Sequence, residues 1–167
     1  MILIKDGRVV DPKRGIDDVL DLLIEDGKIK KIGKYQRSDD YERIVEAKGL
    51  IVAPGLIDVH VHFRDPGFEY KEDIVSGSRA AARGGYTTVI CMANTKPVTD
   101  TAAGVEYIKA RAKEADNCNV HVAGACTQGL KGEILAEMGD MDAHGAVAFT
   151  DDGRGIQDAG MMRRVMD

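Results

Sequence analysis

The sequence predicts an α/β fold, consisting of about the first four βα units of a TIM-type (β/α)8 barrel preceded by a small β-sandwich lobe. In residues 1–52, short apolar stretches are separated by Asp-Gly pairs, whereas from Pro54 onward apolar strands alternate with helical segments. Such alternation indicates βαβ units and a parallel sheet. With 44% hydrophobic and 31% charged residues, the 167-residue chain can also bury a core. We therefore expect a β-sandwich lobe at residues 1–52 and half of a barrel at residues 53–167.

Two Asp-Gly pairs predict tight hairpin turns in the N-terminal lobe. Asp6-Gly7 and Asp26-Gly27 each lie between apolar stretches, and Asp-Gly supplies the positive φ that such turns require. The stretch ERIVEAKGLIVAPG adds one or two more short strands. No group of residues in this lobe suggests a catalytic or metal-binding site.

The rest of the chain predicts four strands that alternate with four helices. The expected strands are 55–62, 86–93, 118–127 and 145–150, and the expected helices are 71–85, 101–115, 132–141 and 157–167. Four units make about half of an eight-stranded barrel, and the last helix shows no C-terminal cap. We therefore expect the N-terminal part of a longer protein, and a poorly soluble or oligomeric product if these residues are expressed alone, because a half barrel leaves strand edges unpaired.

Composition argues against several classes of partner. The net charge of −5 comes without a lysine- or arginine-rich block, which disfavours nucleic acid. No apolar stretch approaches the roughly 20 residues of a membrane helix, and acids occur too early for a signal peptide. Cys91, Cys118 and Cys126 are scattered and odd in number, which favours reduced thiols. We expect a cytoplasmic protein that binds neither nucleic acid nor a membrane.

The stretch IDVHVHFRDPG, residues 57–67, carries a candidate metal site. Side chains alternate along a strand, so His60 and His62 share one face with Asp58, while Ile57, Val59 and Val61 are expected to pack under the helices. Cα atoms two residues apart on a strand are roughly 7 Å apart, which lets both rings reach one ion. Zinc suits imidazole nitrogen. The alternative is a pair of hydrogen-bonded core histidines, which a bare His-x-His motif does not exclude.

Further polar residues follow the other strands, where the active sites of α/β barrels lie. Arg64 follows the first strand, Asn94 the second, and Asp151 and Asp152 the fourth. If Val147 and Phe149 face the helices, Asp152 faces the barrel axis, which favours Asp152 over Asp151 as a ligand. Each residue also has a structural alternative: a surface ion pair of Arg64 with Asp65, a turn role for Asn94, and a solvated Asp-Gly turn at Asp152.

Two other histidines are weaker candidates. His121 lies in the middle of the third strand and is expected to be packed. His144 precedes the fourth strand at the opposite rim and is expected to be solvated. No phosphate-binding loop or dinucleotide fingerprint occurs.

Three stretches, PGLIDVHVHFRDPG, YKEDIVSGSRAAARGGYTTVICMANT and GAVAFTDDG, resemble the dihydroorotase family of the amidohydrolase superfamily. The resemblance covers essentially the whole chain and points to the class I form, which occurs alone or with aspartate transcarbamoylase. It implies a zinc-dependent cyclic amidohydrolase that interconverts N-carbamoyl-L-aspartate and L-dihydroorotate in pyrimidine biosynthesis. Members of this family are more than twice as long as this sequence.

The resemblance also implies residue roles. His60 and His62 would bind one zinc, and Asp152 would be a ligand that bridges to a second zinc. The substrate-binding residues would be His62, Arg64 and Asn94, with Arg64 and Asn94 holding the substrate's carboxylate. The family's later histidine ligands and its catalytic aspartate would lie beyond residue 167, so we expect no turnover from these residues alone.

The sequence departs from related patterns at two points. The family usually has Met-Pro-Asn-Thr where this chain has Met92-Ala93-Asn94-Thr95. Alanine in place of proline leaves the φ angle of the residue before the asparagine unrestricted by a proline ring. Many members of the superfamily bridge their metals with a carboxylated lysine, but the fourth strand here contains no lysine, and Asp152 can take that place.

Two other functions stay open. One is an allantoinase or hydantoinase, although hydantoins need carry no carboxylate for Arg64 to bind. The other is a non-catalytic scaffold for aspartate transcarbamoylase, against which the retention of His60, His62 and Asp152 argues. The expected partners are the small-molecule substrate, further copies of the chain in a homo-oligomer, and aspartate transcarbamoylase.

Overall fold

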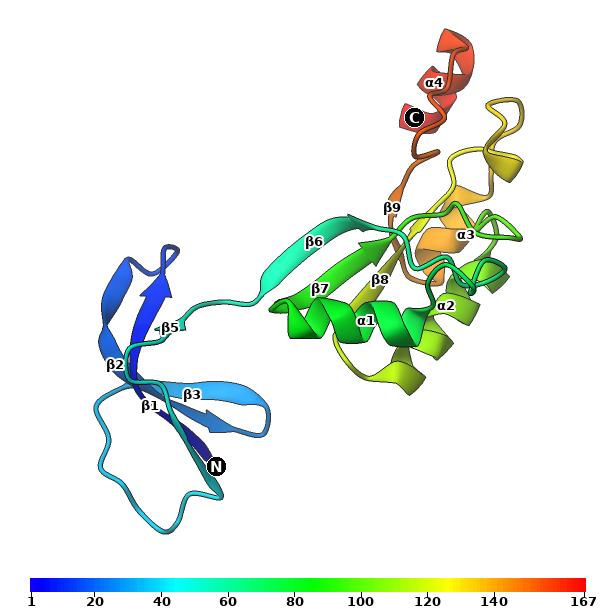
Figure 1. Cartoon of the computed structure of the whole chain (residues 1–167). Helices are drawn as coiled ribbons and strands as arrows, with labels where there is room; N and C mark the ends of the chain where they lie inside the picture. The colour runs from blue at the N-terminus through cyan, green and yellow to red at the C-terminus, as the bar shows by residue number, and fades with distance from the viewer. The chain divides into compact units, whose positions relative to one another are not determined.

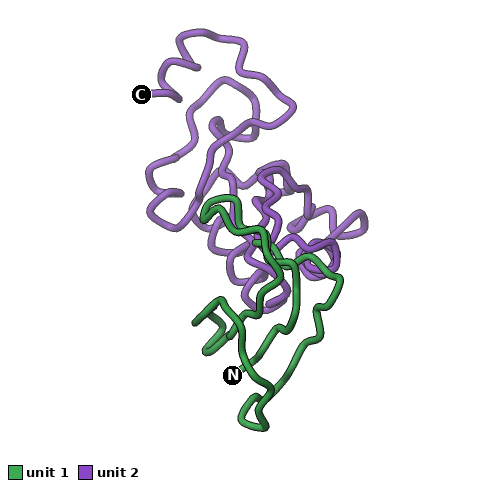
Figure 2. The backbone as a smooth tube through the Cα atoms, turned by 90° about the vertical axis from the view of Figure 1, so that its left-hand side faces the viewer, with its two compact units in different colours: residues 1–54 green, residues 55–167 purple.

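The structure, a computed structural model, describes all residues 1–167 and contains two compact units, Met1–Pro54 and Gly55–Asp167. Figure 1 labels the secondary-structure elements, and Figure 2 colours the two units separately. None of the helices has the length and hydrophobicity that crossing a membrane requires.

Residues 1–54 form one five-stranded sheet with the order β3–β2–β1–β4, in which β5 also pairs with β1. The strands are β1 (Ile2–Asp11), β2 (Ile16–Glu25), β3 (Lys28–Gly33), β4 (Arg43–Glu46) and β5 (Ile51–Val52). Strands β1, β2 and β3 are antiparallel, whereas β4 and β5 run parallel to β1. The expected β-sandwich is not confirmed, because β4 and β5 pair with successive parts of the same strand, Ile2–Lys5 and Arg8–Val9, and so extend one sheet.

The two Asp-Gly pairs have different structures. Asp26-Gly27 forms the predicted turn between β2 and β3, with φ values of 51° and 71°. The turn predicted at Asp6-Gly7 is wrong, because β1 continues through this pair and only shifts its register with β2 there. The physical reason lies in β2: the buried carboxylate of Asp21 accepts a hydrogen bond of 2.7 Å from the Asp6 amide. This contact holds Asp6 at a φ of 58° as the extra residue of a β-bulge.

Asp21 should make the stability of the chain depend on acid pH. Burial alone would raise the pKa of Asp21, but hydrogen bonds from the amides of Asp6 and Tyr35 and from the Lys5 ammonium outweigh it and lower that pKa. The stabilisation is complete above the unfolded-state pKa of about 3.9 and is lost as the pH falls from there through the lower folded-state pKa. In urea unfolding at a series of pH values, Asp21→Asn should remove this pH dependence, whereas the exposed Asp18→Asn should preserve it. Equal pH profiles for Asp21→Asn and the parent would contradict the assignment.

Residues 55–167 form a four-stranded parallel sheet whose strands lie in chain order, β6–β7–β8–β9. The first three helices pack on the sheet, whereas the C-terminal helix lies beyond the end of β9 (Figure 1). The elements are β6 (Leu56–Val61), α1 (Ile74–Arg83), β7 (Tyr86–Cys91), α2 (Ala102–Ala115), β8 (Asn119–Gly124), α3 (Met138–Ala143), β9 (Ala146–Phe149) and α4 (Ala159–Met166). Helix α1 packs on β7, α2 on β8 and α3 on β9. The predicted α/β class with a parallel sheet is therefore confirmed.

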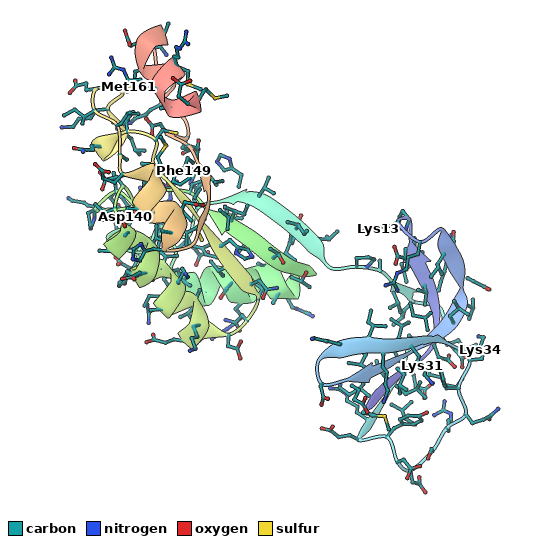
Figure 3. All side chains as sticks on the ribbon, turned by 180° about the vertical axis from the view of Figure 1, so that it is seen from behind. Lys13, Lys31, Lys34, Asp140, Phe149 and Met161 are labelled. Carbon is teal, nitrogen blue, oxygen red and sulfur yellow. The ribbon has the colours of Figure 1, made fainter.

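The core of this unit lies between the sheet and its helices. Val89, Val105 and Val122 are almost completely buried and come from β7, α2 and β8. Phe149, labelled on β9 in Figure 3, packs against the same core. Helix α1 begins at Ile74 because Asp73 caps it: the Asp73 carboxylate accepts a hydrogen bond of 2.7 Å from the Ser76 amide.

The helix predicted at residues 132–141 is shorter than expected. A 3₁₀ turn occupies Gln128–Leu130, and α3 starts only at Met138. The segment between them folds back on the end of β8, because the Gln128 amide donates to the Ile134 carbonyl and the Ala136 amide to the Cys126 carbonyl. These hydrogen bonds replace the helical ones.

The strand-face predictions are only partly right. Ile57 and Val59 do not pack under the helices, since their side chains are 64% and 63% exposed. The register of β6 against β7 is irregular between Asp58 and Val61, and this breaks the simple alternation. Likewise Val147 is 51% exposed, because β9 is irregular against β8 and turns Phe149 toward the helices instead. The prediction that His121 is packed is wrong, because its side chain is exposed.

The cysteines are free thiols. Cys91 and Cys126 are buried, and Cys118 is partly buried. Burial raises the pKa of Cys91 to about 12, so this thiol stays protonated. This agrees with the prediction of reduced thiols.

Candidate metal centre

The candidate site is formed by the segments that follow the parallel strands at their carboxyl ends. His62, Arg64 and Asp65 follow β6, Asn94 follows β7, and Asp152 follows β9. Because all four strands run in the same direction, these segments meet at one edge of the sheet.

The structure brings His60, His62 and Asp152 together. One candidate ligand atom from each side chain lies within 4.8 Å of the other two. His60 Nε2 is 2.9 Å from Asp152 Oδ1, and the two imidazole ring centroids are 5.1 Å apart. The side chain of His60 is 53% exposed and that of Asp152 is 16% exposed, so an ion could reach the group from solvent. Two imidazoles and one carboxylate match the three-ligand sets of catalytic zinc sites, in which ligand atoms about 3 Å apart surround an ion at roughly 2 Å.

Asn94 connects two of the candidate ligands. Its Nδ2 donates a hydrogen bond of 2.7 Å to Asp152 Oδ2, and its Oδ1 lies 3.0 Å from His62 Nδ1. An amide oxygen can only accept, so His62 Nδ1 carries the proton and its Nε2 keeps a lone pair that can bind a metal. The sequence predicted Asn94 as a residue that binds substrate, and its contact with both ligands was not predicted.

Arg64 lines a cleft beside the candidate ligands. The cleft has a volume of about 460 Å³, and Asn94, Asp152 and Arg154 also line it. The alternative of a surface ion pair between Arg64 and Asp65 is wrong: Asp65 points to α2, where it accepts a hydrogen bond of 2.8 Å from the Tyr107 hydroxyl. The guanidinium of Arg64 forms no ion pair, and Arg64 lines the same cleft as Asn94 and Asp152.

Comparison with known proteins identifies the family of this chain. Residues 49–167 match the family model described as dihydro-orotase-like. The chain belongs to this family. It is 56% identical over 166 residues to a dihydroorotase from Geobacter sulfurreducens, covering 99% of this chain and 39% of that protein. It is 53% identical over 167 residues to a dihydroorotase from Clostridioides difficile, again covering 99% of this chain and 39% of that protein. The chain thus spans well under half the length of the curated relatives it matches.

Structural comparison identifies an L-hydantoinase (dihydropyrimidinase) from Arthrobacter aurescens as similar. Its TM-score is 0.82 at 26% sequence identity, and the match covers 98% of this chain and 37% of that one. The family model and the dihydroorotase relatives, and not this structural match, confirm the resemblance to the dihydroorotase family inferred from the three sequence stretches.

In this member of the dihydroorotase-like family, the two neighbouring aspartates have different surroundings. Asp151 is buried, and its Oδ1 accepts hydrogen bonds of 2.8 Å and 3.0 Å from the amides of Cys126 and Thr127. Its Oδ2 accepts a further hydrogen bond from the Thr127 hydroxyl. Asp152 has a φ of 54° and turns toward His60. The hydrogen bonds of Asp151 thereby connect the segment after β9 to the segment after β8. Of the two aspartates, Asp152 is the one that lies beside His60.

Removing the Asp151 carboxylate should destabilise the fold. Asp151→Ala leaves two buried amides without acceptors, so we expect a loss of about 3 kcal/mol in the free energy of unfolding, at roughly 1–3 kcal/mol per group. Urea unfolding of the full-length protein measures this loss, with Asp142→Ala, an exposed position on α3, as the matched control. A loss for Asp151→Ala no larger than that of the control would contradict the proposed connection.

The sequence alone missed Arg154, and it missed the structural roles of Asp65 and Asp151. Arg154 could have been found, because it follows the Asp152-Gly153 turn and lies in the same rim segment. The partners of Asp65 and Asp151 are far away in the sequence, and no local pattern indicates them.

Proposed function

We propose that the full-length protein is a zinc-dependent cyclic amidohydrolase in which His60, His62 and Asp152 hold a zinc ion. The observation that carries the proposal is the meeting of two imidazoles and a carboxylate beside a cleft that Arg64 also lines. A bound zinc would polarise a carbonyl group and lower the pKa of bound water to about 7. The family's usual second zinc, with Asp152 as the bridging ligand, belongs to the same proposal.

The proposed reaction is the reversible cyclisation of N-carbamoyl-L-aspartate to L-dihydroorotate in pyrimidine biosynthesis. Ring closure forms a bond from the carbamoyl nitrogen to the side-chain carboxyl carbon and releases water. The other carboxylate is unchanged, and Arg64 would bind it, because guanidinium offers a planar pair of donors. Asn94 would add an amide donor beside Arg64 while it orients His62 and Asp152. The relatives named dihydroorotase support this substrate.

We further propose that β6–β9 are the first four strands of an eight-stranded barrel. Support comes from the open side of the sheet, where Ile57 and Val59 are exposed as a barrel interior would require. The remaining zinc ligands and the catalytic aspartate would come from later strands.

A hydantoinase-type activity is the second candidate, because the similar L-hydantoinase has a TM-score of 0.82. The two candidates differ at Arg64, which has a purpose only if the cyclic amide carries a carboxylate. The L-dihydroorotate reaction is therefore favoured.

Turnover measurements on the full-length, zinc-loaded protein test the proposal. We expect hydrolysis of L-dihydroorotate and cyclisation of N-carbamoyl-L-aspartate, with little or no hydrolysis of hydantoin or allantoin. Preferred hydrolysis of hydantoin would support the second candidate. Absence of bound zinc together with absence of turnover would instead favour the non-catalytic scaffold.

Three further expectations stay predictions: a homo-oligomer, association with aspartate transcarbamoylase, and a cytoplasmic location. Size-exclusion chromatography of the full-length protein, with and without the transcarbamoylase, tests the first two.

A further inference from the structure

We propose that Asp65 is a positioning residue for recognition of the substrate's carboxylate, acting through the neighbouring Arg64. This inference rests on the proposed function and adds one element to it: contacts of Asp65 with α2 fix the position of the neighbouring Arg64. Asp65 is only 2% exposed, and its Oδ2 is buried without a hydrogen-bond partner. Burial of a carboxylate is unfavourable unless it is compensated, so the contacts of this side chain require an explanation.

Two residues of α2 hold Asp65. The Tyr107 hydroxyl donates a hydrogen bond of 2.8 Å to Oδ1, and Arg111 Nε lies 3.7 Å from Oδ2 as an ion pair. The hydrogen bond to Asp65 also raises the pKa of the Tyr107 hydroxyl, so it remains a donor. Helix α2 is itself fixed in the core by the buried side chains of Val105 and Ile108. Asp65 is thereby attached to a rigid element.

The backbone transmits this attachment to Arg64. Arg64 has a φ of 61°, a left-handed conformation that is uncommon for a residue with a side chain and requires support from its surroundings. The Phe68 amide donates to the Arg64 carbonyl at 2.9 Å, which closes the turn. The Lys96 amide donates to the Pro66 carbonyl at 2.9 Å, which ties this turn to the segment that carries Asn94.

Successive residues therefore point to different places: Asp65 to α2 and Arg64 to the cleft. Loosening the Asp65 anchor should let the Arg64 backbone shift, while the proposed ligands His62 and Asp152, which hydrogen bonds to Asn94 hold, keep their places. Weaker binding of the carboxylate-bearing substrate is the expected consequence, with the chemical step and the bound zinc unaffected.

A double-mutant cycle on the full-length, zinc-loaded protein tests the inference. Tyr107→Phe removes only the hydroxyl, and we expect the KM for L-dihydroorotate to rise about tenfold, the size of one hydrogen bond to a charged group, with kcat and zinc content unchanged. Tyr86→Phe is the matched control, since Tyr86 is partly buried beside the same core and its hydroxyl makes no hydrogen bond. In an Arg64→Gln background, Tyr107→Phe should have no further effect on kcat/KM, because its effect passes through Arg64.

Three results would overturn the inference: additive effects of the two substitutions, a fall in kcat or zinc content that matches the loss of kcat/KM, or no change in KM. Should Tyr107→Phe fold poorly, Arg111→Gln serves as a second variant, with a smaller rise in KM expected. If the parent protein shows no turnover, the proposed function fails separately, and the same cycle is measured as calorimetric binding of L-dihydroorotate. A parent that binds no L-dihydroorotate would contradict both proposals.

Discussion

Replacing Asp152 with asparagine in the full-length protein is expected to abolish tight zinc binding and to lower L-dihydroorotate turnover by about a thousandfold. The expected loss corresponds to roughly 4 kcal/mol, in line with the several kcal/mol that a metal ion contributes to a transition state. Asparagine keeps the size of the side chain and removes its negative charge. Asp152 Oδ1 lies 2.9 Å from His60 Nε2, so the substitution removes the negative charge from within the proposed ligand group.

Zinc content and the dissociation constant of zinc, obtained by competition with a chelator, measure this effect independently of turnover. The control is Asp142→Asn, which removes an exposed acid on α3 and should leave both quantities as in the parent protein. Retention of zinc with near-parental affinity in Asp152→Asn would show that this carboxylate is not a ligand.

Replacing Arg64 with glutamine is expected to lower kcat/KM for L-dihydroorotate by about a hundredfold or more, mainly through a higher KM. Losing the two-pronged pair with the substrate's carboxylate removes charge-assisted hydrogen bonds of roughly 1.5–3 kcal/mol each. Zinc content should stay unchanged, because Arg64 lines the cleft and contributes no metal ligand.

Steady-state kinetics on L-dihydroorotate, with zinc analysis of the same samples, check this expectation. Arg83→Gln, in the last turn of α1, is the matched control for loss of a surface arginine. A kcat/KM for Arg64→Gln within threefold of the parent value would show that Arg64 does not recognise the substrate's carboxylate. That result would favour the hydantoinase-type activity.

Local sequence patterns were sufficient to predict much of the fold. The order of strands and helices after residue 54 was predicted because hydrophobic periodicity and glycine or aspartate caps act within a few residues, as at Asp73 and Gly84. The turn at Asp26-Gly27 was predicted for the same reason. The Asp6-Gly7 turn was not, because the partner that makes this pair a bulge is Asp21, on the next strand.

The candidate site, like the fold, could be predicted only in part from local sequence patterns. The residue types and their places after strands were visible in the sequence, since parallel strands bring their carboxyl ends to one edge, and this was enough to propose His60, His62, Arg64, Asn94 and Asp152. Their roles as ligands and substrate contacts stay predictions. Strand parity failed for Ile57, Val59 and Val147, because irregular register in β6 and β9 resets the alternation.

By itself, the sequence determined the α/β class, the parallel order of the strands and the identity of the polar residues that follow them, because each depends on interactions between near neighbours. Only the tertiary structure decided what each side chain contacts: Asn94 between His62 and Asp152, Asp151 at the amides after β8, and Asp65 at Tyr107. These hydrogen bonds join residues 24 to 58 positions apart. Their formation depends on the packing of whole strands and helices, which no short stretch of sequence encodes.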